Sequence, residues 1–233
     1  MSVPKTKSMR IRSFIIAYAL VLAILLFADR RPSPGQDRYS HVVDLTDGQG
    51  ADKQAPTAKG SKGQNSAESR TQIVAPDALI PGTWTASQIP AERLIAPLVV
   101  IDVKPSSAGI SQLSLDDIAA WEDRNGTIPQ GAVIAVRHAP LSDSRQATAF
   151  PINSGTAQFL MDARYTTGFA TESPADFNLD RTLARQIALH GNYVVEGASR
   201  LSALPAAGSL IIVAPAKKKD GGRAPVRVLA MVR

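Results

Sequence analysis

The sequence predicts an α/β domain with a mixed β-sheet, preceded by one N-terminal transmembrane helix. Two observations predict the domain. Largely β-branched apolar runs, such as PLVVIDV at 97–103, alternate with helical segments, and a capping signal at Ser114 opens one of these helices. A third observation predicts the membrane helix, because residues 14–28, FIIAYALVLAILLFA, form an apolar run without a charge.

The domain is expected to begin with a short strand at 41–47, HVVDLTD. The run at 97–103 has the composition of a strand that is buried on both faces. The remaining pattern predicts strands at 132–136, 193–196, 209–215 and 225–232, and helices at 155–163 and 179–190.

The helix that follows Ser114 shows the clearest start signal. Ser114 is an N-cap residue, and the two acids in the first turn complement the positive end of the helix dipole. Helical spacing predicts that Leu115, Ile118 and Trp121 form its buried stripe. Trp84 and Trp121 are interpreted as packing residues rather than as a platform for a substrate.

Composition and charge restrict the function. The chain has 233 residues, 44% of them hydrophobic and 20% charged, as in a globular protein with one ordinary domain. The absence of cysteine excludes disulfides, thiolate metal sites and a cysteine nucleophile. The net charge of +6 is unevenly spread, with +5 over 1–31, −4 over 71–213 and +5 over 214–233. This distribution does not resemble the basic stripe of a nucleic-acid-binding face.

The apolar segment at 14–28 has two interpretations. At 1.5 Å per residue it covers about 22 Å of a roughly 30 Å hydrocarbon core, and flanking arginines can snorkel across the difference. The other interpretation is a signal peptide cleaved after Ala28, which would place the bulky Leu26 at position −3. We favour an uncleaved anchor in the bacterial inner membrane, with residues 1–13 cytoplasmic and the domain in the periplasm.

Two further segments complete the predicted organisation. Residues 29–39 form a polar linker, and the domain occupies 40–233. Within it, residues 48–70 are rich in Gly, Ala, Ser, Lys and Gln and lack aromatic residues, so a flexible loop is expected there.

Several motifs resemble the cyclase family of metal-dependent hydrolases, which includes bacterial arylformamidases and isatin hydrolases. VDLTD at 43–47 is similar to the family's I-D-L-T-H, and IPAERLIAPLVVIDV at 89–103 is similar to I-P-L-E-x-L-I-G-P-x-V-V-I-D-V. YVVEGASRLSALPAAG at 193–208 and GGRAPVRVLA at 221–230 also match, the latter one residue shorter than its counterpart. The resemblance implies a cyclase-like (swivelling β/β/α) fold and, for the family, a metal-dependent hydrolytic site.

The family's metal-binding block, H-x-G-T-H-x-D-x-P-x-H, aligns with residues 68–78 of this chain. The alignment implies that the ligand positions are occupied by other residues here, and that the glutamate alone is retained. These vestigial positions are Glu68, Gln72, Val74, Ala78, Ala184 and the retained Glu196. The family's opening histidine is likewise replaced, by Asp47.

The loss of these ligands favours an inactive domain. Valine and alanine have no donor atoms, and a transition-metal site needs three or four converging ligands to activate a water molecule. We therefore expect no metal, no cofactor and no catalytic residue. Glu196 is interpreted as a structural acceptor near Arg200 or another cation.

The remaining candidate groups have ordinary structural interpretations. His138 lies at a strand end, and His190 before Gly191 caps a helix C-terminus. Ser154 lacks the G-x-S-x-G context of a nucleophile. Lys217–Lys219 are interpreted as a solvated turn rather than as a phosphate site.

The sequence thus favours a catalytically inactive cyclase-like domain, anchored in the membrane as a structural or interaction subunit. Its expected partners are an integral membrane protein complex or further copies of the chain, and no nucleic acid is expected. Two alternatives remain open. One is a metal-dependent amide or cyclic-imide hydrolase, and the other is a periplasmic module that binds a small ligand.

Overall fold

The computed structural model describes residues 39–47, 71–103, 112–138, 150–174, 177, 180–217 and 221–233. The basic N-terminus, membrane helix and most of the linker predicted over 1–38 lie outside these ranges, as does the loop predicted at 48–70. Within the described ranges, no helix combines the length and the apolar character that crossing a membrane requires. Tyr39–Arg233 form one compact unit.

In the described part of the chain, eight strands form one mixed sheet in the order β1-β8-β2-β6-β5-β4-β3-β7. The strands are β1 (His41–Asp44), β2 (Gln72–Val74), β3 (Ile95–Val103), β4 (Val133–His138), β5 (Gly168–Thr171), β6 (Tyr193–Glu196), β7 (Ser209–Pro215) and β8 (Arg223–Val232). Strands β3 to β6 are parallel to one another, whereas β2, β7 and β8 pair antiparallel with their neighbours.

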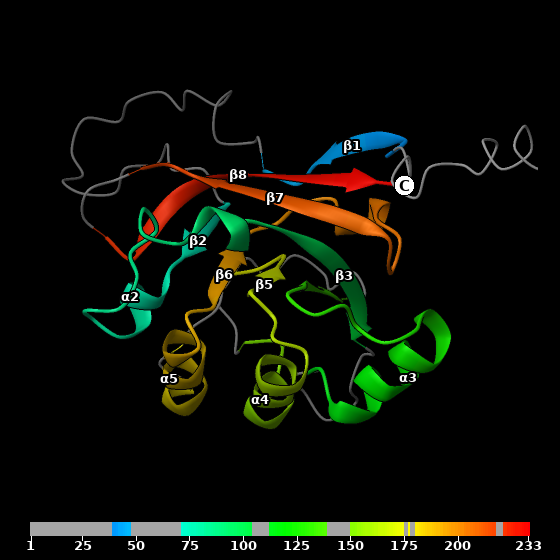
Figure 1. Cartoon of the computed structure of the whole chain (residues 1–233), viewed down its shortest axis with the longest axis horizontal. Helices are drawn as coiled ribbons and strands as arrows, with labels where there is room; N and C mark the ends of the chain where they lie inside the picture. The colour runs from blue at the N-terminus through cyan, green and yellow to red at the C-terminus, as the bar shows by residue number, and fades with distance from the viewer. Residues whose placement is uncertain are drawn as a thin grey trace, which may run out of the picture. The chain divides into compact units, whose positions relative to one another are not determined.

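The sheet closes on itself because β7 also pairs with β8. Figure 1 shows β7, β8 and β1 lying across β3 to β6, with α3 (Leu115–Asn125), α4 (Ser154–Ala163) and α5 (Arg181–Leu189) on the opposite side. Each of these helices connects two parallel strands. The arrangement is the β/β/α layering implied by the sequence, with a short additional helix, α2 (Pro76–Leu79), after β2.

Two hydrophobic cores separate the three layers, and β3 contributes to both. Leu98 and Val100 belong to the cluster between the two β layers, whereas Val99 and Ile101 belong to the cluster beneath the helices. Successive side chains of a strand point to opposite faces, so a strand that is covered on both sides needs a continuous apolar run. The prediction of a doubly buried strand at 97–103 is confirmed.

Helix α3 begins with the predicted cap. The Ser114 side chain accepts a hydrogen bond from the Asp117 backbone N–H, and the Asp117 side chain accepts one from the Ser114 N–H, which forms a capping box. Trp121 then attaches the helix to β3, because its indole Nε1 donates to the Val100 carbonyl at 3.0 Å. Ile118 and Trp121 are buried as expected.

The prediction that Leu115 is buried was wrong, since 49% of this residue is exposed. Leu113, before the cap, occupies the core instead and forms an isolated bridge with Ile152. No strand or helix was predicted at β2 or α2, and no bounds were given for β5, and these elements are three or four residues long. Segments this short show few periods of hydrophobic alternation, although β1 and β6, with four residues each, were predicted.

An ion pair between α3 and the end of α4 should make the stability of the domain depend on pH. Arg164 donates from Nε and Nη2 to the two carboxylate oxygens of Glu122, each at 2.8 Å, and this contact lowers the pKa of Glu122 below its ordinary value of 4.5. A lowered pKa in the folded state stabilises the fold above pH 4.5 and ceases to do so as the pH falls through the folded value.

We therefore expect Glu122→Gln to lower the free energy of unfolding by about 1 kcal/mol at pH 7, with the difference from wild type shrinking toward pH 3. Urea denaturation across this pH range measures the effect. Glu92→Gln, at an exposed residue, is the control and should be neutral. A loss from Glu122→Gln that stays constant down to pH 3 would contradict the assignment.

Candidate functional site

Strands β8, β2 and β6 lie side by side and bring together the positions that the resemblance assigns to metal ligands. Gln72 is directly opposite Glu196 on β6 and Pro225 on β8. Val74 is opposite Val194 on β6 and Arg223 on β8. Opposed residues point to the same face of a sheet. The side chains of Gln72, Glu196 and Arg223 therefore share the face that also carries the helices.

The carboxylate of Glu196 is the centre of this group. The residue is 0% exposed, and its Oε2 accepts hydrogen bonds from Arg223 Nη1 at 2.7 Å and from Gln72 Nε2 at 2.9 Å. The Arg223 side chain remains 43% exposed, so the guanidinium extends from the buried carboxylate toward solvent. Burial of a carboxylate costs several kcal/mol unless a cation or hydrogen-bond donors compensate its charge, and here both are present.

Two other vestigial positions have become part of the hydrophobic core. Val74 is fully buried and Ala184, on α5, is 7% exposed, and both belong to the cluster beneath the helices. Val194, opposite Val74, belongs to the same cluster. These side chains pack against apolar neighbours and offer no atom to a cation.

The fifth described position, Ala78, lies on α2, where the chain is held close to the start of β8. The Ala75 backbone N–H donates to the Gly222 carbonyl at 2.6 Å. A Cβ atom at Gly222 would collide with the backbone of Ala78, so this approach requires glycine. The two glycines before Arg223 therefore place α2 and the arginine next to each other.

The segment with the family's opening motif also reaches this region. The backbone N–H of Asp47 donates to Thr71 Oγ1 at 2.7 Å, and the same hydroxyl donates to the Gly197 carbonyl at 2.8 Å. Thr71 and Gly197 are the direct neighbours of Gln72 and Glu196. The backbone of Asp47 is thus linked through Thr71 to the residue that follows Glu196.

Of the six vestigial positions, Glu68 lies outside the described residues, and the other five lie on the adjoining elements β2, α2, α5 and β6. The sequence did not single out Arg223. It favoured Arg200 or another cation as the partner of Glu196, and the structure supplies Arg223. The GGR segment, shortened by one residue relative to the family motif, marks a departure from the family at Arg223 but does not identify the partner of this arginine.

The donor set in this region does not fit a transition-metal centre. Val74, Ala78 and Ala184 have no donor atoms, and Glu196 is already paired with a fixed positive charge. A divalent cation beside the carboxylate would be repelled by the guanidinium of Arg223. Across the described ranges, no group of three His, Cys, Asp or Glu side chains is arranged to hold a metal ion.

The histidine and serine candidates do not form a catalytic group. His190 follows α5, where its Nδ1 is 2.8 Å from the Gln186 carbonyl and its Nε2 is 2.9 Å from Asp162 Oδ1. Gly191 follows with φ 65°, which agrees with the predicted helix cap. Asp162 and Ser154 lie at opposite ends of α4, about 12 Å apart along the helix, so Ser154 is remote from His190. The side chain of His138 lies outside the described part.

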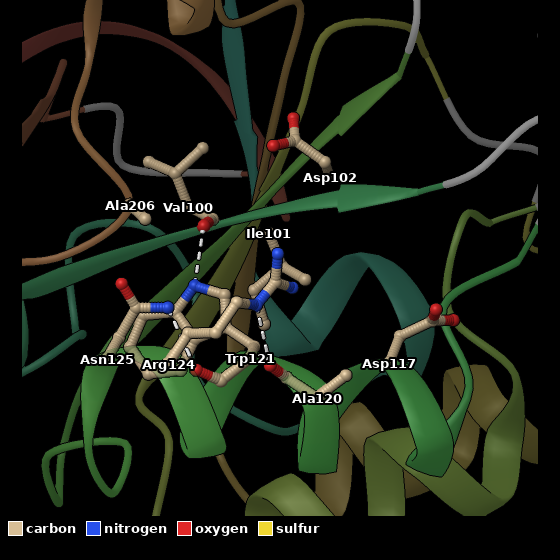
Figure 2. Close-up of a pocket in the computed structure, with 9 residues that line it drawn as sticks. All are labelled: Val100, Ile101, Asp102, Asp117, Ala120, Trp121, Arg124, Asn125 and Ala206. Atoms are coloured by element: carbon tan, nitrogen blue, oxygen red, sulfur yellow. Dashed lines mark hydrogen bonds between the residues drawn. The ribbon is translucent and has the colours of Figure 1, made fainter.

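A small cavity lies between β3 and α3, away from Glu196. Figure 2 shows its lining, in which the Val100 carbonyl of β3 meets Trp121 of α3 while the side chains of Val100 and Asp102 point away from the helix. Its volume of about 230 Å³ is below the range of roughly 300–1,000 Å³ that is typical of ligand pockets. Strands β3 and β6 are separated by β4 and β5, or about 14 Å across the sheet. The cavity is therefore separate from the vestigial site.

The contact between Glu196 and Arg223 should be the main stabilising interaction at this junction. We expect Arg223→Met to lower the free energy of unfolding by about 2–3 kcal/mol, because it leaves a buried carboxylate without its cation. The double variant Glu196→Gln/Arg223→Met should lose clearly less than the sum of the two single losses. Urea denaturation of the wild type, Glu196→Gln, Arg223→Met and the double variant measures this coupling energy.

Arg227→Met is the matched control, because Arg227 is on the same strand and its ion pair with Asp44 is largely exposed, at 69% and 40% of the two side chains. It should change stability by no more than about 0.5 kcal/mol. Additive losses at Glu196 and Arg223 would show that the pair does not act as a unit.

Solved structures with the same architecture are isatin hydrolases and predicted metal-dependent hydrolases. Isatin hydrolase A from Labrenzia aggregata, bound to benzyl benzoate, matches with a TM-score of 0.65 and 26% identity over 82% of this chain and 93% of that chain. Isatin hydrolase A from Ralstonia solanacearum matches with a TM-score of 0.62 and 24% identity over 100% of both chains. A predicted metal-dependent hydrolase from Bacillus stearothermophilus has a TM-score of 0.53 and 21% identity, over 83% of this chain and 98% of that chain.

A search of curated proteins found no match. The sequence pattern of a family described as putative cyclase matches residues 36–175, which is more than half of the chain. This match covers β1 to β5, and the resemblance at β6 and β8 extends the likeness to the C-terminus. The chain therefore belongs to the putative cyclase family.

Proposed function

We propose that this chain is a catalytically inactive cyclase-family domain that serves as a membrane-anchored structural or interaction subunit of a membrane protein complex. The observation that supports inactivity is the contact at Glu196. The glutamate that the resemblance assigns to the metal site is buried against Arg223 and Gln72. A carboxylate neutralised in this way is an element of the fold rather than a metal ligand or an acid–base group.

The composition of the neighbouring positions supports the same proposal. Val74 and Ala184 pack in the core, and replacing either by a metal ligand would put a polar group into a closely packed apolar cluster. One lost ligand can be compensated, but here several positions lack donor atoms together. If this position carries out no reaction, the domain acts through the contacts that its surface makes with other molecules.

The proposed location rests on the sequence of residues 1–38. The basic residues before the apolar run at 14–28 favour an orientation with the N-terminus in the cytoplasm and the domain in the periplasm. An anchor confines the domain to the membrane and raises its effective concentration for a membrane partner. Even a modest interface on the domain would then be occupied.

A second candidate function is metal-dependent hydrolysis of an amide or cyclic imide. The 26% identity with isatin hydrolase A from Labrenzia aggregata favours it. This function would need metal ligands other than the residues that the motif alignment assigns. The first experiment distinguishes it from the inactive domain. The third alternative is a periplasmic module that binds a small ligand in the vestigial pocket near Glu196, apart from the cavity between β3 and α3.

The first experiment measures metal content and hydrolysis. We expect the purified full-length protein to retain no stoichiometric zinc or manganese after dialysis, and to hydrolyse neither isatin nor N-formylkynurenine. Elemental analysis and absorbance assays provide the two measurements, with isatin hydrolase A from Ralstonia solanacearum as the positive control. One or two metal ions per chain, or turnover above the uncatalysed rate, would favour the hydrolase instead.

The second experiment tests the anchored subunit. In mild detergent we expect the full chain to co-purify from bacterial membranes with an integral membrane complex, and intact mass to show Met1 or Ser2 as its N-terminus. Val21→Arg should release the chain from the membrane fraction, because an arginine at the centre of the span costs about 2.5–3.5 kcal/mol. Val21→Leu is the matched control and should remain bound.

Two results would contradict this part of the proposal. An N-terminus at Asp29 would identify residues 1–28 as a cleaved signal peptide. A protein that is recovered from membranes only as a free monomer or homodimer would not be a subunit of a larger complex.

A further inference from the structure

The layer of β1, β7 and β8, which none of the described helices covers, has an apolar outer face. Side chains of β8 alternate, so Val228 and Ala230 enter the core between the β layers while Leu229 and Met231 point outward. We define the outer face by the apolar side chains that point away from this core on neighbouring strands: Val42, Ile95, Leu210, Ile212, Leu229 and Met231. It belongs to the layer of β1, β7 and β8, opposite the helices in Figure 1.

The strand register shows that these side chains are continuous across the sheet. One row runs from Leu210 on β7 through Met231 on β8 to Val42 on β1. The adjacent row runs from Ile95 on β3 through Ile212 on β7 to Leu229 on β8. Directly opposed side chains lie about 5 Å apart, so the two rows form one patch that spans four strands.

Water reaches this patch. Val42 is 57% exposed and Ile95 is 54% exposed, although both are β-branched apolar residues, and the other four are half-buried. At the margin, Asp44 pairs with Arg227 at 3.1 Å, so this acidic side chain already has a cation. A continuous exposed apolar patch on a sheet is typical of a surface that binds a membrane or another molecule.

The charge of the domain is arranged around this face. Among the described residues at the C-terminal end of the chain, Arg227 lies on β8, Arg233 at its end and Lys217 after β7. The opposite, helical layer exposes Asp116 and Asp123 on α3. Lys217, Arg227 and Arg233 are therefore on the side of the apolar rows, whereas the helical layer is mixed in charge, because α5 exposes Arg181 and Arg185. A surface that carries anionic phospholipid attracts the cations beside the rows.

The chain also enters the domain at this layer. Tyr39 and Ser40 directly precede β1, and the Ser40 N–H donates to the Val232 carbonyl at 2.6 Å. Arg233 lies over the Tyr39 ring at 5.9 Å, so the two ends of the domain meet beside the patch. Residues 29–38 join this point to the apolar segment at 14–28 and reach about 35 Å when fully extended.

We propose that the outer face of β1, β7 and β8 lies on the surface of a bilayer that contains anionic phospholipid. The proposal rests on the membrane anchoring that we propose for residues 14–28, and it adds the orientation of the domain. The apolar rows contact the interface of the bilayer, Arg227 and Lys217 contact its headgroups, and the helical layer faces away. The helices and the vestigial site are then the surfaces left for a protein partner.

Because the chain contains no cysteine, single labels can test the orientation. Val42→Cys and Ile95→Cys place a polarity-sensitive fluorophore on the outer face, and Leu115→Cys and Leu189→Cys place it on the helical layer, where these residues are 49% and 62% exposed. All four full-length variants are reconstituted in vesicles of phosphatidylcholine and phosphatidylglycerol. Quenching by a lipid-attached quencher and by aqueous iodide is then measured.

We expect the lipid-attached quencher to reduce fluorescence several-fold more at Val42 and Ile95 than at the two helical positions, with the reverse order for iodide. Phosphatidylcholine alone should reduce the contrast, as should raising the ionic strength toward 1 M, where the Debye length is about 3 Å. Arg227→Gln combined with Lys217→Gln should weaken the contrast in the same direction.

Three outcomes would overturn the inference. Equal lipid quenching at all four positions in vesicle-bound protein would refute the orientation but leave the anchor intact. Protection of Val42 and Ile95 from iodide without lipid quenching would show that a protein, such as a second copy, covers the face. Protein that does not remain with the vesicles would refute both the orientation and the anchor.

Discussion

Strand β8 is the element on which the rest of the structure depends. Its first residues pair with β2, its last residues pair with β1, and its other edge pairs with β7. The pairing with β7 closes the sheet and encloses one core, while the pairing with β2 brings the C-terminal strand beside the vestigial site. Strand β8 thus closes the sheet, supplies the arginine that pairs with Glu196 and contributes side chains to the exposed outer face.

The alternation of side chains along β8 explains how a single strand does this. Even-numbered residues such as Val228 fill the interior, and odd-numbered residues point outward. At the start of the strand the outward direction leads to Glu196, near α2 and α5, so Arg223 meets a buried carboxylate. Farther along, none of the described helices lies over the strand, and Leu229 and Met231 are partly exposed. A shift of one residue would exchange these roles.

The sequence predicted the fold well because its strongest signals are local. The bounds of β6 and β7 agree with the predicted 193–196 and 209–215, and the cap of α3 was identified from Ser114 and its two acids. The site was predicted only as a set of lost ligands. Its new content, the pairing of Arg223 with Glu196, depends on the register of β6 and β8 on β2, the strand between them, which lies far earlier in the chain. No periodicity or motif in one segment carries that information.

The arginine at Glu196 also has an evolutionary consequence. A histidine restored by mutation at Gln72 or Ala184 would bring a metal ion toward a carboxylate that already holds a guanidinium, so the first steps of a reversal would gain little affinity. Loss of the arginine first would leave a buried charge without its partner and destabilise the fold. Metal ligands introduced beside Glu196 would therefore gain little affinity while Arg223 is present, and removal of Arg223 alone would cost stability.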